Sequence, residues 1–272
     1  MSSSPTAPEP ETREFYRRSL RGLIESGVPF LVGGAYALAK QAGVERHTKD
    51  LDVFLRPADR DRALEALEAG GCRIDVAFPH WLAKAYEGDG QGRRFIDVIY
   101  RSGNGLGEVD DEWFAHAPES EILGVPVRLT PLEESLWSKA FVMERERFDG
   151  ADVAHILHAR GRELDWDRLV RRFGPHWRVL LAHVVLYGFI YPSDRDRVPP
   201  AVLEELSRRL LAETVAPPEA DAVCQGTLLS REQYLKDVGP LGFEDGRVAP
   251  RGLLTAEEVE AWTEAIGREK AH

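Results

Sequence analysis

Residues 30–54 read FLVGGAYALAKQAGVERHTKDLDVF. A short apolar segment, residues 30–32, is interrupted by Gly33 and Gly34. An Ala- and Leu-rich run typical of a helix follows, and after a polar turn the alternation of residues 50–55 indicates a strand. The pattern therefore predicts a strand–helix–strand unit.

The second strand of this unit carries two carboxylates. Side chains two residues apart on a strand point to one face, so Asp50 and Asp52 share a face while Leu51 and Val53 face the core. Two carboxylates this close repel each other unless a cation lies between them. Hard divalent cations such as Mg²⁺ take oxygen ligands and are often shared with substrate phosphates. The segment therefore indicates a metal site, although such a pattern is more often the solvated face of a half-buried strand.

The paired glycines add a candidate anion site. Because Gly33 and Gly34 have no Cβ, the backbone there can approach a phosphate closely, and the N-terminus of the following helix offers unpaired N–H groups to it. A Gly-Gly pair alone more often marks a turn. Together with the two carboxylates, within one strand–helix–strand unit, it favours nucleotide chemistry.

A third carboxylate interrupts an apolar strand further along the chain. Residues 93–100 read RRFIDVIY, and residues 81–100 are expected to form a hairpin around the Gly-rich residues 88–92. An aspartate inside such a strand should be exposed, paired or metal-bound. Asp97 is therefore the candidate third ligand, with an edge-strand residue facing water as the alternative.

The order of these features resembles the nucleotidyltransferase superfamily typified by DNA polymerase β. It is more closely similar to the AbiEii-type nucleotidyltransferases of bacterial abortive-infection and toxin–antitoxin systems. The resemblance rests on Gly33-Gly34, then Arg46-x-Thr48-x-Asp50-Leu51-Asp52, then a later strand aspartate. It implies transfer of a nucleoside monophosphate from an NTP such as ATP to an acceptor hydroxyl. It also implies that Asp50, Asp52 and Asp97 are catalytic and bind Mg²⁺, with Mn²⁺ as the alternative ion.

The resemblance further implies a set of nucleotide-binding residues. These are Gly33 and Gly34 through their amides, Arg46 and Thr48 before the second strand, and Lys139 on a later helix. A surface loop arginine and a solvated helix lysine are the alternatives for Arg46 and Lys139. The next family segment, R-x-K-D-x-x-D-I, is matched in part by residues 146–153, where Asp149 and Asp152 are kept and Phe148 replaces the lysine. These two aspartates could instead cap and charge the N-terminus of their own helix.

The expected fold class is α/β (α+β): a nucleotidyltransferase-type mixed β-sheet with flanking helices, followed by a C-terminal helical part. Four segments are expected: a disordered tail (1–11), the α/β catalytic domain (12–129), a helical domain (130–214), and a linker with a C-terminal helical extension (215–272). Thr130 and Glu133 around Pro131 predict a capping box at the start of a helix that runs to about Arg145.

Composition and charge argue against several classes of protein. The net charge of −11 argues against broad non-specific nucleic-acid binding, which needs many basic contacts to phosphates. Two cysteines predict neither a disulfide framework nor a zinc cluster. There is no signal-peptide pattern and no apolar run long enough to span a bilayer, so a cytoplasmic protein without membrane association is expected. The densest basic segment, which is either a solvated helix face or a site for an RNA or phosphate acceptor, contains Arg168, Arg171, Arg172 and Arg178.

These observations lead to one main hypothesis and two alternatives. The main hypothesis is a Mg²⁺-dependent nucleotidyltransferase whose acceptor is a tRNA end, a protein or a small molecule. The family resemblance implies that it could act as a toxin with an antitoxin protein as partner. The first alternative is a non-catalytic protein of the same fold that binds a partner. The second is a metal-dependent phosphohydrolase, which would use the carboxylates but would not need the glycine pair.

Overall fold

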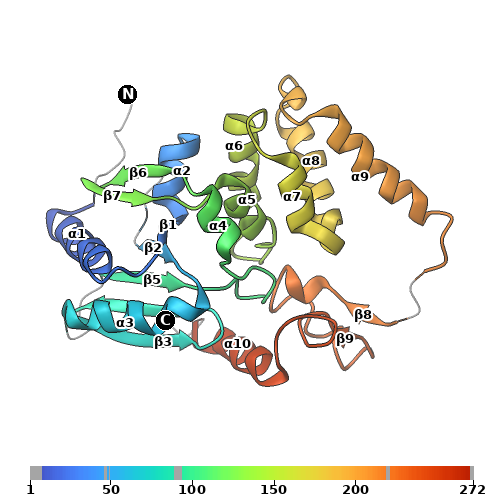
Figure 1. Cartoon of the computed structure of the whole chain (residues 1–272). Helices are drawn as coiled ribbons and strands as arrows, with labels where there is room; N and C mark the ends of the chain where they lie inside the picture. The colour runs from blue at the N-terminus through green and yellow to red at the C-terminus, as the bar shows by residue number, and fades with distance from the viewer. Residues whose placement is uncertain (1–7, 46–47, 49, 89–93, 219–220, 270–272) are drawn as a thin grey trace. The chain divides into compact units, whose positions relative to one another are not determined.

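A computed structural model describes residues 8–45, 48, 50–88, 94–218 and 221–269 of the chain. The chain divides into two compact units, residues 1–131 and 132–272 (Figure 1). The expectations for the N-terminal tail up to residue 7, for Arg46 and for most of the turn at 88–92 lie outside the described residues.

A five-stranded mixed sheet forms the centre of the first unit (Figure 1). Its strands, in spatial order, are β1 (Leu31–Val32), β2 (Leu51–Phe54), β5 (Phe95–Ile99), β4 (Leu82–Glu87) and β3 (Cys72–Phe78). β2 and β5 are parallel, and the other neighbouring strands are antiparallel. β5 is therefore the central strand, with a neighbour on each edge.

Helices and a hairpin complete the first unit. They are α1 (Pro10–Glu25), α2 (Gly34–Ala42), α3 (Arg60–Ala69), α4 (Asp111–His116), and the hairpin of β6 (Glu119–Ile122) and β7 (Val125–Arg128). Apolar residues of α1 and α3 share one buried cluster with the inward side chains of β2 and β5. In β2, Leu51 and Val53 are fully buried and Asp52 between them is not, which is the alternation that the sequence predicts.

Helices dominate the second unit, which agrees with the helical part expected after the sheet. They are α5 (Leu132–Ala140), α6 (Gly150–Arg160), α7 (Trp166–Phe173), α8 (Trp177–Ile190), α9 (Pro200–Glu213) and α10 (Ala256–Glu269). α5 packs against α6, α7 and α8, and two short strands, β8 (Val223–Cys224) and β9 (Glu244–Asp245), pair before α10. The observed mixed sheet, flanking helices and helical C-terminal part confirm the predicted fold class.

Two local expectations are wrong. The helix predicted to reach Arg145 ends at Ala140. The capping box predicted for its start does not form, because the Thr130 amide donates to the Val32 carbonyl (3.0 Å) and the Glu133 carboxylate accepts from the Asp165 amide (2.7 Å). Long-range partners therefore take both groups that a local motif would have used.

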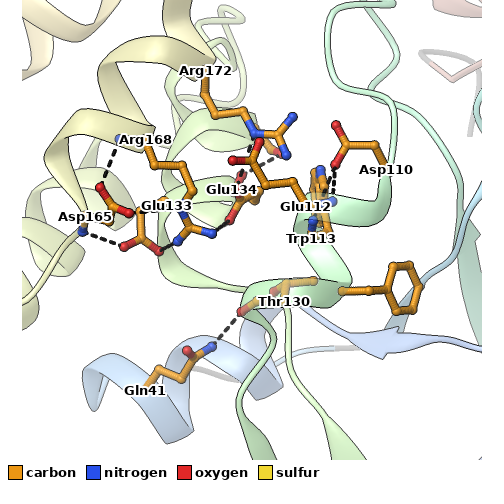
Figure 2. A network of polar contacts seen from close by, with 12 residues as sticks. Gln41, Asp110, Glu112, Trp113, Thr130, Glu133, Glu134, Asp165, Arg168 and Arg172 are labelled. Atoms are coloured by element: carbon orange, nitrogen blue, oxygen red, sulfur yellow. Dashed lines mark hydrogen bonds and ion pairs between the residues drawn. The ribbon is translucent and has the colours of Figure 1, made fainter.

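The short helix α4 has no counterpart in the sequence-based expectations. Asp110 starts it, because its carboxylate accepts hydrogen bonds from the amides of Glu112 (3.0 Å) and Trp113 (3.3 Å) (Figure 2). Its six residues are too few for an apolar period to be recognised. In the described part of the chain, no helix combines the length and the apolar character that crossing a bilayer requires.

Candidate active site

Three carboxylates converge on one face of the sheet. Asp52 lies on β2, Asp97 lies on β5, and Asp50 directly precedes β2. One carboxylate oxygen of each aspartate lies within 4.8 Å of those of the other two. Asp52 and Asp97 are direct partners in the parallel register of β2 and β5. The structure thus brings together the three aspartates that the sequence indicated, and the alternative that Asp97 is an edge-strand residue is wrong because β5 is central.

The chemistry of this cluster fits a divalent cation. Its donor atoms are carboxylate oxygens, which both Mg²⁺ and Mn²⁺ prefer. All three aspartates are partly exposed, so a hydrated ion and a substrate phosphate can reach them. Thr48, another predicted site residue, donates from its hydroxyl to Asp50 Oδ1 (2.6 Å) and thereby orients that carboxylate.

The glycine pair supports this face in a way that differs from the expectation. The Gly33 amide donates to the Asp52 carbonyl (3.0 Å), so this N–H is used within the sheet and is not offered to a phosphate. A Cβ on Gly33 would lie 2.3 Å from the Phe54 ring, and therefore the packing here requires glycine. Gly34 is the first residue of α2, where N–H groups have no carbonyl partner within the helix. Of the two predicted anion-binding residues, Gly34 at the start of α2 therefore stays a candidate, together with the turn that follows it.

Burial and the carboxylates raise the pKa values of two tyrosines, Tyr16 and Tyr36. Burial raises the pKa of Tyr16, and Tyr36 and the three aspartates raise it further. Burial and the charge of Asp50 raise the pKa of Tyr36 to about 12. The two rings meet edge to face at 6.2 Å. Both hydroxyls therefore remain protonated at neutral pH.

A lysine that the sequence does not single out, Lys84, lies beside this carboxylate cluster. Lys84 on β4 places its Nζ 2.6 Å from Asp97 Oδ1. The two residues face each other directly across the β4–β5 hairpin. The sequence does not fix this pairing, because the Gly-rich segment between the two strands leaves the register open.

In the second unit, Lys139 pairs with two aspartates. Its Nζ lies 3.0 Å from Asp149 Oδ2 and 2.7 Å from Asp152 Oδ2, and its side chain is only 12% exposed. The solvated-lysine alternative is therefore wrong. The capping alternative is wrong for Asp149, because at the N-cap of α6 its side chain makes no cap hydrogen bond.

The charge state of Asp149 follows from these contacts. Burial alone would raise its pKa, but hydrogen bonds and charges from Arg147 and Lys139 outweigh burial and hold the pKa below its ordinary value. The Asp149 carboxylate is therefore ionised at neutral pH and forms a charged pair with Lys139.

Two of the four arginines of the basic segment are internal, whereas Arg171 and Arg178 are exposed. The Arg168 side chain is 3% exposed and pairs with Glu133 (2.5 Å) and Glu134 (3.5 Å) (Figure 2). Arg172 pairs with Glu134 (3.3 Å) and lies over the Trp137 ring. Burial raises the pKa of Glu134 although both arginines oppose it. Arg168 and Arg172 therefore do not form the acceptor surface that the sequence suggested.

A family model matches most of the chain. The chain matches the family described as uncharacterised nucleotidyltransferase over residues 16–187. No curated protein sequence is significantly similar to the chain.

Three solved structures are similar in part. They are the antibiotic-resistance factor ANT(2'')-Ia in solution (16% identity, 75% of this chain and 95% of that one, TM-score 0.39), the lincosamide antibiotic adenylyltransferase LnuA with lincomycin (15%, 54% and 95%, 0.37), and JHP933 from Helicobacter pylori (14%, 76% and 100%, 0.38). The family match spans more than half of the chain, whereas these structural similarities are weaker. On the family match, the chain belongs to the uncharacterised nucleotidyltransferase family and is an enzyme of the nucleotidyltransferase class.

Proposed function

We propose that this enzyme transfers a nucleoside monophosphate from an NTP to an acceptor hydroxyl, and that it requires Mg²⁺ or Mn²⁺. The observation that carries the proposal is the convergence of Asp50, Asp52 and Asp97 within 4.8 Å. In this reaction the acceptor oxygen forms a bond to the α-phosphorus, and the bond to the pyrophosphate oxygen breaks. The acceptor proton must go to a base, and we assign this role to one of the carboxylates of the cluster.

Different residues of the first unit would bind the cation, bind the phosphates and orient a carboxylate. Asp50, Asp52 and Asp97 would hold the divalent cation, which when bound stabilises charge on the attacking and leaving oxygens. Gly34 and the first turn of α2 present N–H groups to the phosphates. Thr48 keeps Asp50 oriented through the 2.6 Å hydrogen bond. The first unit, corresponding to the α/β domain expected from the sequence, is thus the proposed catalytic domain.

The role of Lys139 stays a prediction of the resemblance. Its two ion pairs with Asp149 and Asp152 support a structural role within the second unit. Binding a nucleotide phosphate would require it to leave at least one of these partners. Arg46, the other basic residue implied, lies outside the described residues.

Two observations bear on the acceptor. The net charge is −11, and two of the four arginines of the basic segment, Arg168 and Arg172, are held in internal ion pairs. Both favour a protein hydroxyl or a small molecule over RNA as the acceptor. Action as an AbiEii-type toxin with an antitoxin partner is a finer proposal, which rests on the sequence motifs alone.

The test is to incubate the pure protein with each α-labelled NTP, Mg²⁺ and a cell extract that is then separated into RNA, protein and small molecules. Label should appear in one fraction, and Asp52→Asn or excess EDTA should abolish it. Asp75→Asn, which changes an exposed aspartate on β3, is the matched control and should keep activity. Release of nucleotide products without labelled acceptor would indicate a phosphohydrolase. Complete inactivity of a folded protein with all four NTPs would favour the partner-binding alternative.

A further inference from the structure

A row of charged residues crosses four neighbouring strands at one level of the sheet. Asp52 pairs with Asp97, Asp97 with Lys84, and Lys84 with Asp75, on β2, β5, β4 and β3 in that order. Directly paired residues present their side chains on the same face. The ammonium group of Lys84 thus lies in line with the carboxylates proposed to bind the cation.

Lys84 has two carboxylate neighbours in this row and contacts one. Its Nζ is 2.6 Å from Asp97 Oδ1, whereas the exposed Asp75 makes no ion pair with it. The pair is largely shielded, with side chains 24% and 13% exposed for Lys84 and Asp97. The ammonium also lies 4.2 Å from the centre of the Phe95 ring. Lys84 is thus a well-placed positive charge at the third carboxylate.

We infer that Lys84 acts as an exchangeable counter-ion of Asp97, which holds the carboxylate in place before the divalent cation binds and competes with the cation for it. The inference rests on the proposed function, because it assumes that Asp97 binds a divalent ion. An ammonium and a divalent cation a few ångströms apart repel strongly in a partly shielded site. Binding the cation therefore requires the ammonium of Lys84 to move off Asp97.

When the cation displaces Lys84 from Asp97, the Lys84 ammonium becomes able to contact a second negatively charged group. Once displaced, its ammonium remains tethered to β4, next to the carboxylate that contacts the cation. A nucleotide phosphate is the group of opposite charge that arrives there in the proposed reaction. Lys84 thus weakens binding of the free cation and favours binding of cation and nucleotide together, as a positioning residue that couples the two events.

The test measures Mn²⁺ binding to the full-length protein by electron paramagnetic resonance, with no nucleotide present. Lys84→Met removes the charge and keeps an apolar stem beside Phe95, and it should tighten Mn²⁺ binding by about tenfold because the repulsion is lost. Lys84→Arg keeps the charge and should bind Mn²⁺ like the wild type. Asp75→Asn, in the same row, should also match the wild type.

Two results would overturn the inference alone: wild-type Mn²⁺ affinity in a folded Lys84→Met variant, or weaker affinity. The absence of Mn²⁺ binding in the wild type would refute the metal site of the proposed function as well, so the two failures can be told apart. If Lys84→Met does not fold, crystals of the wild type soaked with Mn²⁺ decide the question. Lys84 Nζ should then be more than about 4 Å from Asp97, beyond ion-pair distance. A pair that remains intact beside a bound ion would contradict the exchange.

Discussion

Gly34 and Asp52 are in direct contact: a Cβ on Gly34 would lie 1.6 Å from Asp52 Oδ2. Gly34 also has φ of +57°, a conformation that L side chains rarely adopt. The first residue of α2 and the carboxylate on β2 thus form one assembly, in which the helix N-terminus faces a negative charge. Any side chain at position 34 would disturb both the helix start and the carboxylate cluster.

Gly34→Ala should therefore abolish nucleotide transfer and lower the free energy of unfolding by about 1–3 kcal/mol, the usual cost of strained backbone. Gly43→Ala is the matched control, because Gly43 has a similar φ of +65° but has no neighbour within 4 Å of an added Cβ. It should lose comparable stability and keep activity. Urea denaturation and the labelled-NTP assay measure both effects. Equal activity in the two variants would show that contact with Asp52 is irrelevant to catalysis.

The acidic cluster predicts that divalent ions stabilise the fold. A ligand that binds the native state alone adds about 2.7 kcal/mol when its free concentration is 100 times its Kd. Wild-type protein should therefore melt at a higher temperature in Mg²⁺ than in EDTA. The Asp50→Asn/Asp52→Asn variant should melt at the same temperature in both. Differential scanning calorimetry checks this, and an equal Mg²⁺ response in the variant would mean that the ion binds elsewhere.

Lys139→Met should destabilise the second unit by about 3–5 kcal/mol, because it leaves Asp149 and Asp152 buried without their shared cation. Lys40→Met, at an exposed position on α2, is the control and should change stability by less than about 0.5 kcal/mol. Chemical denaturation of both variants at neutral pH measures the difference. A Lys139→Met variant as stable as the wild type that has lost nucleotide affinity would instead support the phosphate-binding role.

The same ion pairs predict a pH dependence. The folded-state pKa of Asp149 lies below its unfolded value, so its contribution to stability is present at neutral pH and is lost as the pH falls through the folded pKa. Without Lys139, burial is less opposed and Asp149 should bind its proton at a higher pH. The stability deficit of Lys139→Met should therefore narrow as the pH falls from 7 towards about 4. Unfolding free energies measured across this range test the sign, and a widening deficit would contradict it.

Arg168→Met should cost about 3–5 kcal/mol, since Glu133 and Glu134 would lose their buried partner. Arg171→Met changes an exposed arginine on the same helix and should cost little. If α7 were instead an acceptor-binding surface, Arg171→Met would impair transfer and Arg168→Met would leave stability unchanged. Thermal melts and the transfer assay on both variants separate the two possibilities.

The acidic cluster could be predicted from the sequence because its signals are local or strongly contrasting. Alternation placed Asp50 and Asp52 together, and a charged residue within an apolar strand marked Asp97. These rules depend only on the two-residue period of a strand and on the cost of burying a charge. The family resemblance then supplied the chemistry of the cluster.

The remaining features depend on contacts between distant segments. Lys84 lies beside Asp97 because of the pairing register of β4 and β5, and the sequence between these strands does not determine that register. The sequence predicts a phosphate contact for the Gly33 amide and a capping role for Glu133, but these groups bond to Asp52 and Asp165 instead. Arg168 belongs to a basic segment of the kind that usually faces solvent. Its side chain is nevertheless buried, because Glu133 and Glu134 on α5 neutralise its charge. Such pairings cannot be read from spacing along the chain.

The central position of β5 has a consequence for how accurately the site is built. Ile96 and Val98, on either side of Asp97, are fully buried, and a slip of one residue would exchange them with the carboxylate. The free energy that opposes such a slip comes from hydrophobic burial in the interior of the unit. The position of the Asp97 carboxylate is thus fixed by the burial of the neighbouring Ile96 and Val98 side chains. Polar residues around this face can therefore be substituted without moving Asp97 relative to Asp52.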